Sequence, residues 1–382
     1  MGAGATRDAV TSIAGRPWLV PIAADAEADR EAWEVARLEG IGGSDAAAIV
    51  GEHPHRGAID VWMERVSGSV LSVDHERTEV GRLLEPTVLG WYEAGAPAWP
   101  RGGGRLTVVK PPTVYHRDRP WQRGSADGLV FLPEALEHLW AERGDLSASD
   151  VVQLAPASAL DHLVEVKSHG WMGGRAYDAV LGEDGSPVDI PADKRIQCAW
   201  YMALYDVPRC RLLCLVDTHL RRTLEVERDR ELEASLLEEV ETFWTSYVVT
   251  GEMPPPDGSE SYRRHLGERF RKHRPELIAS TPDIDAAIGD LVGMKAEEKA
   301  LKQRIEAAEQ IVKAHIGDAA GVMSALGACT WKAQASGKLK LREALSELYS
   351  VAGWTDDEIA AFEARHALPD VRVFRTPKPR KR

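Results

Sequence analysis

Apolar and charged positions alternate in one short stretch near the middle of the chain, His162 to Lys167. Side chains along a strand point alternately to its two faces, so Glu165 and Lys167 share one face. A carboxylate and an ammonium on an apolar strand are costly to bury unless they pair or serve a site. A plain surface ion pair on an edge strand is the alternative, and Glu-x-Lys alone is too common to decide between the two.

Apolar residues at three- and four-residue spacing predict helices on both sides of this strand. The predicted helices span residues 30–39, 58–66, 78–93, 192–205 and 231–250. Inside helix 78–93, Pro86 predicts a kink or a later helix start. Stretches rich in β-forming residues predict strands at 105–110, 113–116, 126–131, 211–217 and 223–228. This mixture predicts an α/β (α+β) domain with a central mixed sheet.

A glycine-rich run, residues 40–43, leads into a short helix of small residues. Ser44 is the predicted N-cap of this helix, and Gly51 is its predicted stop. Helix N-termini attract anions through their free N–H groups and the helix dipole. Without further context, the same pattern describes a capped helix that binds nothing.

The C-terminal third differs in pattern from the rest of the chain. Three prolines, residues 254–256, interrupt it, and the apolar positions of residues 283–315 predict a long amphipathic helix. Their spacing approaches a heptad, but Glu298 interrupts it, which favours a helical hairpin or packing arm over a coiled coil. A short strand near residues 330–332 and a helix at 356–366 follow. The predicted organisation is a loose leader (1–29), a main domain (30–255), a linker (256–282), a long helix or hairpin (283–325) and an extension with a basic tail (326–382).

Composition limits the classes of function. The chain has 382 residues and a net charge of −13, which argues against a broad basic surface for nucleic acid. Only the tail reverses this charge, and its basic residues either contact DNA or solubilise the end: Arg372, Arg375, Lys378, Arg380, Lys381 and Arg382. No apolar run reaches the ~18 residues of a membrane span, and we expect a cytoplasmic protein.

Carboxylates that precede or lie on predicted strands suggest metal-dependent phosphodiester chemistry. Mg²⁺ prefers carboxylates and waters, and it activates a water while stabilising a leaving oxygen. Asp127 and Glu165 are the predicted ligands, with the carbonyl of Val166 as a third and Glu85 as a further ligand. Lys167 would orient the water or act on the phosphate charge.

Two residues on the predicted helix 192–205 complete this set. Gln197 and Tyr201 are four residues apart and therefore project together. Taken alone, they also fit an amphipathic helix with a chance polar residue.

Five motifs in this order resemble the YqaJ-type viral recombinase group, which includes phage lambda exonuclease and belongs to the PD-(D/E)XK nuclease superfamily. The motifs are Ile41-Gly42-Gly43-Ser44-Asp45, Gly81 to Glu85-Pro86, Ser125-Ala126-Asp127-Gly128, Glu165-Val166-Lys167 and Gln197 to Tyr201. The resemblance covers residues 33–250. It implies Mg²⁺-dependent digestion of one strand of a DNA duplex from its 5′ end, with Mn²⁺ able to substitute. It also implies 3′ tails for a single-strand annealing protein, and a ring-shaped homotrimer.

The resemblance also implies roles for single residues. Asp127 and Glu165 would bind metal, Glu85 would lie on the helix beside it, and Lys167 would assist the water. Gln197 and Tyr201 would lie near the active site. The positions that match the 5′-phosphate pocket are Arg37, Ser44 and Ser125. Two departures stand out: residues 133–160 form an insertion that decorates or blocks the DNA groove, and the arm at 283–315 would hinder a ring.

Two other readings remain open. One is another PD-(D/E)XK enzyme, a RecB-like, CRISPR-adaptation-type or restriction-type endonuclease, many of the first carrying an iron–sulfur cluster. No cysteine precedes Asp127, and Cys198 lies inside a predicted helix, so we expect no cluster. The other is a non-enzymatic DNA-end-binding scaffold for recombination, which the intact Asp127, Glu165 and Lys167 disfavour.

Overall fold

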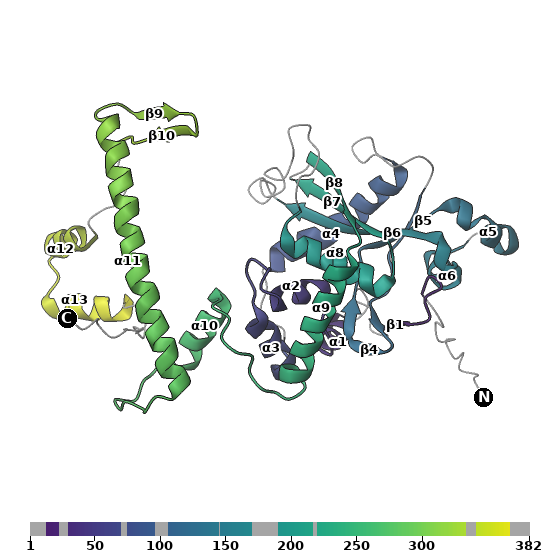
Figure 1. Cartoon of the computed structure of the whole chain (residues 1–382), viewed down its shortest axis with the longest axis horizontal. Helices are drawn as coiled ribbons and strands as arrows, with labels where there is room; N and C mark the ends of the chain where they lie inside the picture. Colours follow the sequence, from purple (N-terminus) through teal and green to yellow (C-terminus); the bar gives the residue numbers. More distant parts are fainter. Residues whose placement is uncertain are drawn as a thin grey trace. The chain divides into compact units, whose positions relative to one another are not determined.

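The computed structural model describes residues 13–22, 30–69, 75–95, 106–144, 146–169, 190–216, 220–333 and 341–366. The glycine-rich loop after Lys167 and the basic tail lie outside these residues. The chain divides into two compact units, residues 1–266 and 267–382 (Figure 1). Each unit is described by itself below.

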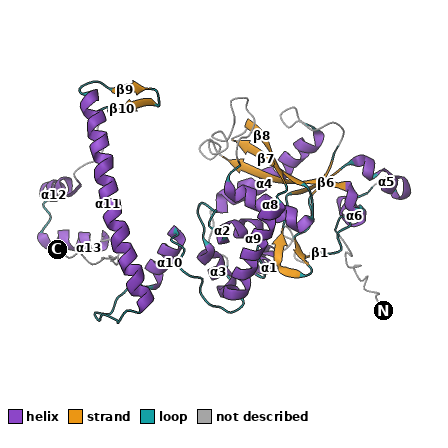
Figure 2. Ribbon diagram, in the orientation of Figure 1, coloured by secondary structure: helices purple, strands orange, loops and turns teal. Residues whose placement is uncertain are grey.

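A five-stranded mixed sheet forms the centre of the first unit (Figure 2). Its strands, in spatial order, are β2 (Thr107–Val109), β5 (Gly128–Phe131), β6 (Leu160–His169), β7 (Arg209–Val216) and β8 (Leu220–Glu227). Strands β6 and β7 pair in parallel, and the other neighbours pair antiparallel. A parallel pair needs a crossover between its strands, and the helix α8 (Ala192–Tyr205) lies within that connection.

Helices cover both faces of this sheet. On one face α4 (His75–Ala94) packs against the apolar side chains of several strands, among them Val130, Val164 and Leu213. On the other face Leu129, Leu163 and Leu212 share a larger core with residues of α8. Since side chains alternate along β6, Glu165 and Lys167 lie on the face of Leu163, beneath α8. The predicted class, a central mixed sheet flanked by helices with a helical C-terminal part, is confirmed.

Other helices of the first unit begin close to the residues predicted from the sequence. They are α1 (Arg30–Leu38), α2 (Gly43–Ile49), α3 (Ala58–Ser67) and α9 (Arg230–Phe243), the last continuing into a π turn at Trp244–Val248. The limits predicted for α8 are confirmed to the residue. The later start suggested by Pro86 is wrong, because α4 begins at His75 and runs through the proline.

The first unit also contains a second sheet, of three strands. It contains β1 (Leu19–Pro21), β3 (Val114–His116) and β4 (Arg119–Gly124) in that spatial order. Strand β1 falls within the segment predicted as a loose leader. In that segment Ile13 and Leu19 are each 1% exposed, so residues 13–22 contribute to the core.

Arg16 ties this N-terminal segment to the end of α8. Its guanidinium donates to the carbonyls of Tyr205 and Asp206, the latter at 3.2 Å, and to Ala14 O at 2.7 Å. Trp18 Nε1 donates to Leu204 O at 3.0 Å. The last carbonyls of a helix lack partners within the helix, so these donors satisfy groups that would otherwise be orphaned.

The predicted insertion at residues 133–160 is built into the core. It contains 3-10 turns at Pro133–Ala135 and Ala157–Ala159 and two short helices, α5 (Glu137–Arg143) and α6 (Ala148–Leu154). Its apolar side chains join the main hydrophobic cluster, including Leu136, Leu139, Val151 and Val152. These residues are therefore part of the fold.

The segment predicted as a linker contains a helix, α10 (Glu260–Arg269). Tyr262 Oη donates to Pro254 O at 3.1 Å, and Arg264 Nη2 lies 3.0 Å from Asp60 Oδ1 on α3. Both contacts lie within the first unit, so the start of α10 belongs to it.

The second unit is built around one long helix (Figure 1). Helix α11 (Pro282–Ile316) has 35 residues and is a single helix, so the hairpin alternative is wrong. It is followed by the hairpin of β9 (Gly321–Ser324) and β10 (Gly327–Thr330), and by α12 (Leu341–Ala352) and α13 (Asp356–His366). The limits predicted for α13 are confirmed. Among the described helices, none combines the length and the apolar character needed to cross a membrane.

Candidate active site

The pairing of β5 with β6 brings Asp127 next to Glu165. Gly128 pairs with Val164, and Asp127 comes directly before β5, opposite the next residue of β6. Oδ2 of Asp127 accepts a hydrogen bond from the backbone N–H of Val166 at 2.7 Å. The local register of two strands, 39 residues apart in sequence, therefore sets the distance between these two carboxylates.

Glu165 is held at one oxygen and free at the other. Lys167 Nζ and Gln197 Nε2 both donate to its Oε1, the amide at 2.5 Å. Its Oε2 is also buried, since the residue is only 2% exposed, and within the described part of the chain it has no hydrogen-bond partner. A buried carboxylate oxygen without a donor is costly, and a cation is one group that would satisfy it.

The charges of the site are strongly coupled. Burial, together with the neighbouring Glu165, raises the pKa of Asp127 well above its usual range. For Lys167, burial opposes the charged form, but Glu165 and Asp127 outweigh it and raise the pKa above its usual value. Lys167 is therefore an ammonium, suited to stabilising negative charge and not to accepting a proton.

Tyr201 lies beside Gln197 on α8, as predicted from their spacing. Gln197 Nε2 is 3.4 Å from Tyr201 Oη, a weak hydrogen bond. Burial and the nearby Glu165 raise the pKa of Tyr201 above its usual value, so the phenol stays neutral. The structure thus brings together Asp127, Glu165, Lys167, Gln197 and Tyr201 from three elements.

Gly43 is a site residue that the sequence reasoning did not single out. A Cβ at this position would lie 2.9 Å from Gln197 Cγ and 3.2 Å from Tyr201 Cζ. The start of α2 therefore approaches α8 at a distance that only glycine permits without displacement of these side chains. The signal available in the sequence was the glycine run itself, which was interpreted as a loop.

Glu85 lies near the site, on the helix that covers the opposite face of the sheet. It lies on α4, and its Oε1 accepts from Lys110 Nζ at 2.8 Å. Its charge contributes to the raised pKa of Asp127, which places it within electrostatic range. Lys110, just after β2, is a second neighbour that sequence reasoning missed.

The donor set fits a divalent cation held by two carboxylates. Among the residues that the structure describes, no three His, Cys, Asp or Glu side chains are grouped closely enough to hold a metal ion. Mg²⁺, however, is commonly held by one or two carboxylates with waters and substrate phosphates completing the shell. The free Oε2 of Glu165 beside Asp127 matches this requirement.

The residues predicted to bind a 5′ phosphate have different surroundings from those expected. Ser44 is not the N-cap of α2: Gly42 occupies that position, and its N–H donates to Asp45 Oδ2 at 3.2 Å. Ser125 does not share a strand with Asp127, because β4 ends at Gly124 and β5 begins at Gly128. Arg37 lies over the ring of Trp33, with 5.2 Å from its Cζ to the ring centroid.

A buried ion cluster supports the loop between α1 and α2. Asp45 Oδ1 lies 3.0 Å from Arg56 Nη1, and its Oδ2 is bonded to Arg65. Glu64 joins both arginines at 2.7 and 3.0 Å. Burial disfavours the charged form of Asp45, but Arg65, Arg37 and Arg56 outweigh it and hold its pKa well below the usual range. Arg37 thus attracts Asp45 through space.

Arg65 also fixes this loop through its backbone. Its Nε donates to Gly40 O at 2.8 Å, while its side chain is only 2% exposed. The loop that leads to Ser44 therefore rests on a charged cluster that cannot rearrange without exposing charge to an apolar interior.

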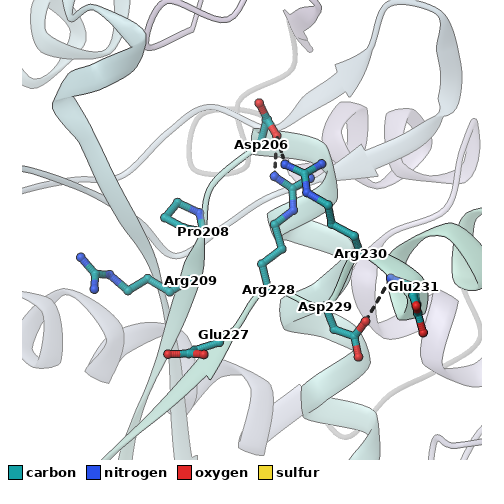
Figure 3. Close-up of a pocket in the computed structure, with 8 residues that line it drawn as sticks. All are labelled: Asp206, Pro208, Arg209, Glu227, Arg228, Asp229, Arg230 and Glu231. Carbon is teal, nitrogen blue, oxygen red and sulfur yellow. Dashed lines mark hydrogen bonds and ion pairs between the residues drawn. The ribbon is translucent and has the colours of Figure 1, made fainter.

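A separate pocket of about 1010 Å³ opens where β7, β8 and α9 meet, lined in part by Arg209, Arg228 and Arg230 (Figure 3). Arg228 and Arg230 both point at Asp206, at the far end of α8 from the pair Gln197–Glu165. Acidic residues thus offset the positive charge, and none of the predicted site residues lines this pocket. It does not fit a phosphate site.

Comparison with known proteins identifies the region that holds the site. Residues 32–207 match the YqaJ-like viral recombinase domain. The family resemblance inferred from the five motifs is confirmed over this region. The chain is also 22% identical to the uncharacterized protein YqaJ of Bacillus subtilis (strain 168) over 336 residues, 86% of this chain and 92% of the relative.

Two solved structures are similar to part of this chain. An alkaline exonuclease from Laribacter hongkongensis is 18% identical with a TM-score of 0.41, covering 62% of this chain and 97% of its own. A phage-related exonuclease from Haemophilus somnus 129PT is 14% identical with a TM-score of 0.35, covering 56% of this chain and 96% of its own. Similarity of this degree assigns no role to a residue. The match to the YqaJ-like domain supports a nuclease role.

Proposed function

We propose that this chain is a divalent-metal-dependent exonuclease that digests one strand of linear duplex DNA from its 5′ end. The product is a 3′ single-stranded tail, the substrate of a single-strand annealing protein in a phage-infected or prophage-bearing bacterium. The observation that carries the proposal is the buried, unpartnered Oε2 of Glu165 beside Asp127, with Lys167 on the same strand face. Most buried polar atoms in native proteins have a hydrogen-bond partner, so this oxygen calls for an explanation that a cation would provide.

Asp127, Glu165 and the carbonyl of Val166 would hold the cation, with Glu85 as a further ligand. When bound, Mg²⁺ or Mn²⁺ supplies Lewis-acid stabilisation of the charge that develops on the phosphate oxygens. Gln197 orients Glu165 by donating to Oε1, and Oε2 would then be the oxygen that binds the cation. Glu85 would have to give up its contact with Lys110 to bind the cation.

Lys167 acts in this proposal through its charge. Its raised pKa keeps the ammonium protonated, so it attracts the scissile phosphate and orients the water without removing a proton from it. Tyr201 stays neutral and supports Gln197. The proton of the attacking water therefore leaves to solvent in this scheme.

Specificity for an end would come from a pocket for the terminal 5′ phosphate, to which Arg37, Ser44 and Ser125 contribute. An arginine fork and two hydroxyls suit a phosphate. The buried cluster below the loop attracts Arg37 through Asp45 and keeps the loop in place. A continuing DNA strand has no terminal phosphate to offer such a pocket.

The deciding experiment is digestion of linear duplex DNA bearing either a 5′ phosphate or a 5′ hydroxyl, with Mg²⁺, Mn²⁺ or EDTA. We expect mononucleotide release from the 5′-phosphorylated end with either metal and none with EDTA. A covalently closed circle is the matched control, because an endonuclease of the same superfamily would cut it. DNA-end binding without release in either metal would favour the non-enzymatic scaffold.

Arg37→Ala tests the phosphate pocket within the same assay. A charge-assisted contact contributes about 1.5–3 kcal/mol, so digestion should slow by roughly ten- to a hundredfold on 5′-phosphorylated ends. The loss should be small on 5′-hydroxyl ends. Equal loss on both would mean that Arg37 supports the fold through Trp33 and Asp45 instead.

A further inference from the structure

Helix α11 leaves a line of large apolar side chains in solvent. Its 35 residues make it about 52 Å long at a rise of 1.5 Å per residue. Ile284, Leu301 and Ile305 are 53%, 52% and 50% exposed. Isolated exposed apolar residues are ordinary, but a continuous line of them along one helix marks a surface that is covered by another molecule.

The exposed line follows a heptad repeat. Counting Ile284 as the first position of a heptad, the first positions are Ile284, Leu291, Glu298, Ile305 and Val312, and the fourth positions are Ala287, Met294, Leu301, Ala308 and His315. Every one of these is apolar except Glu298 and His315. A seven-residue repeat that runs from Ile284 to the end of the helix is the pattern of a left-handed coiled coil.

We propose that the α11 helices of two copies of this chain pair side by side as a parallel, in-register coiled coil. In that arrangement the seventh residue of one heptad faces the fifth residue of the next heptad on the partner helix. The pairs that result are Asp290 with Lys295, Glu297 with Lys302, and Arg304 with Glu309. All three are attractive, and each occurs twice by symmetry.

The antiparallel alternative places like charges together. With the two helices fully overlapped in opposite directions, Glu297 faces its own copy and Lys302 faces its own copy, although Asp290 then meets Arg304 and Lys295 meets Glu309. The charge pattern therefore selects the parallel arrangement. The β-branched Ile284, Ile305 and Val312 at first positions, with Leu301 at a fourth position, favour two strands over three.

Glu298 sits at the centre of the apolar line and sets the register. Its Oε1 accepts from Lys302 Nζ at 2.6 Å on the same helix, which partly compensates its charge. A polar residue at one first position disfavours shifted registers, in which it would face apolar side chains, at a cost in stability. Glu298→Leu should therefore tighten the dimer and loosen its register.

A disulfide trap in the full-length chain tests the parallel pairing directly. Of the native thiols, Cys329 is exposed while Cys198, Cys210 and Cys214 are buried, so Cys329→Ser is the background. Ile284→Cys in that background should give a chain dimer under mild oxidation, because parallel pairing places the two introduced thiols side by side. An antiparallel pair would separate them by nearly the length of the helix. Failure to cross-link would overturn the parallel arrangement.

Mass measurement in solution, by light scattering at micromolar concentration, tests the number of chains. We expect two chains, and Ile305→Asp should give one chain with unchanged helical content, since Ile305 is exposed in the single chain. Glu297→Lys should raise the dimer Kd by about tenfold. The double variant Glu297→Lys, Lys302→Glu should regain part of the lost affinity. A single chain in the wild type, or three chains as the family resemblance implies, would overturn the two-stranded proposal.

Discussion

Gln197 on helix α8 and Lys167 on strand β6 both donate to the same oxygen of Glu165. The two donors lie on different elements, so the orientation of the carboxylate depends on the packing of α8 against the sheet. Oε2, the oxygen left over, is thereby aimed away from both donors. The helix is thus part of the site through one amide group.

The Gln197 amide should set the affinity of the site for metal. Removal of a group that orients a metal ligand typically costs ten- to a hundredfold, so we expect Gln197→Ala to lower kcat/KM by about tenfold at limiting Mg²⁺. Most of the loss should return at high Mg²⁺. Tyr201→Phe is the matched control, because it removes only the 3.4 Å contact and should change activity by about twofold or less. An equal loss in both variants would indicate that Tyr201 contacts the substrate.

Replacement of Asp127 should lower the nuclease activity and raise the stability of the fold. Burial and repulsion from Glu165 oppose its charge, so Asp127→Asn should abolish cleavage yet raise the free energy of unfolding by about 1 kcal/mol in EDTA. Thermal unfolding and nucleotide release, measured on the same preparation, check both halves. Lower stability would mean that the hydrogen bond from Val166 outweighs the repulsion.

The ion cluster at Asp45 should be a major source of stability. Asp45→Asn leaves Glu64 to compensate the charges of both Arg56 and Arg65 in a largely buried setting, and we expect a loss of about 3–5 kcal/mol in the free energy of unfolding, measured in urea. Arg263→Ala is the control, because its pair with Glu260 is fully solvated, and exposed pairs contribute about 0–1 kcal/mol. Similar effects of the two changes would refute the assignment of a structural cluster.

His162 should make the fold sensitive to mild acid. Tyr92 Oη lies 2.8 Å from its Nε2, Asp161 Oδ2 lies 2.6 Å from its Nδ1, and burial lowers the pKa of the imidazole to about 4. In the unfolded chain His162 has a pKa of about 6.5. Between that pH and about 4, the imidazole is therefore protonated in the unfolded chain but neutral in the folded one. This contribution to stability is complete above about pH 6.5 and is lost as the pH falls toward 4.

Unfolding in urea at two pH values measures this effect. We expect His162 alone to make the free energy of unfolding about 2 kcal/mol lower at pH 5 than at pH 7. In His162→Gln the difference between the two pH values should shrink by about that amount, whatever its stability at pH 7. An unchanged pH dependence would show that other groups control acid unfolding.

Local periodicity predicted the elements that carry the site, and long-range packing explains what it missed. The period of two in His162–Lys167 and the helical spacing around Gln197 need only neighbouring residues, and both were predicted correctly. Strand β1 pairs with β3, in which Leu19 meets His116, a partner that no local window contains. The local placements expected for Ser44 and Ser125 were wrong, because Gly42 caps α2 and because the chain changes sheets between Gly124 and Gly128.

The contacts of Arg16 with the end of α8 show that the fold extends beyond the region recognised as a family domain. The recognised domain spans residues 32–207. Arg16 and Trp18, which donate hydrogen bonds to the last carbonyls of α8, precede it. Strand β7, which pairs with Glu165 through Leu212, follows it. A protein trimmed to the recognised domain would keep every predicted catalytic side chain. It would nevertheless lose the supports that aim them, so domain boundaries drawn from sequence families would yield an inactive fragment here.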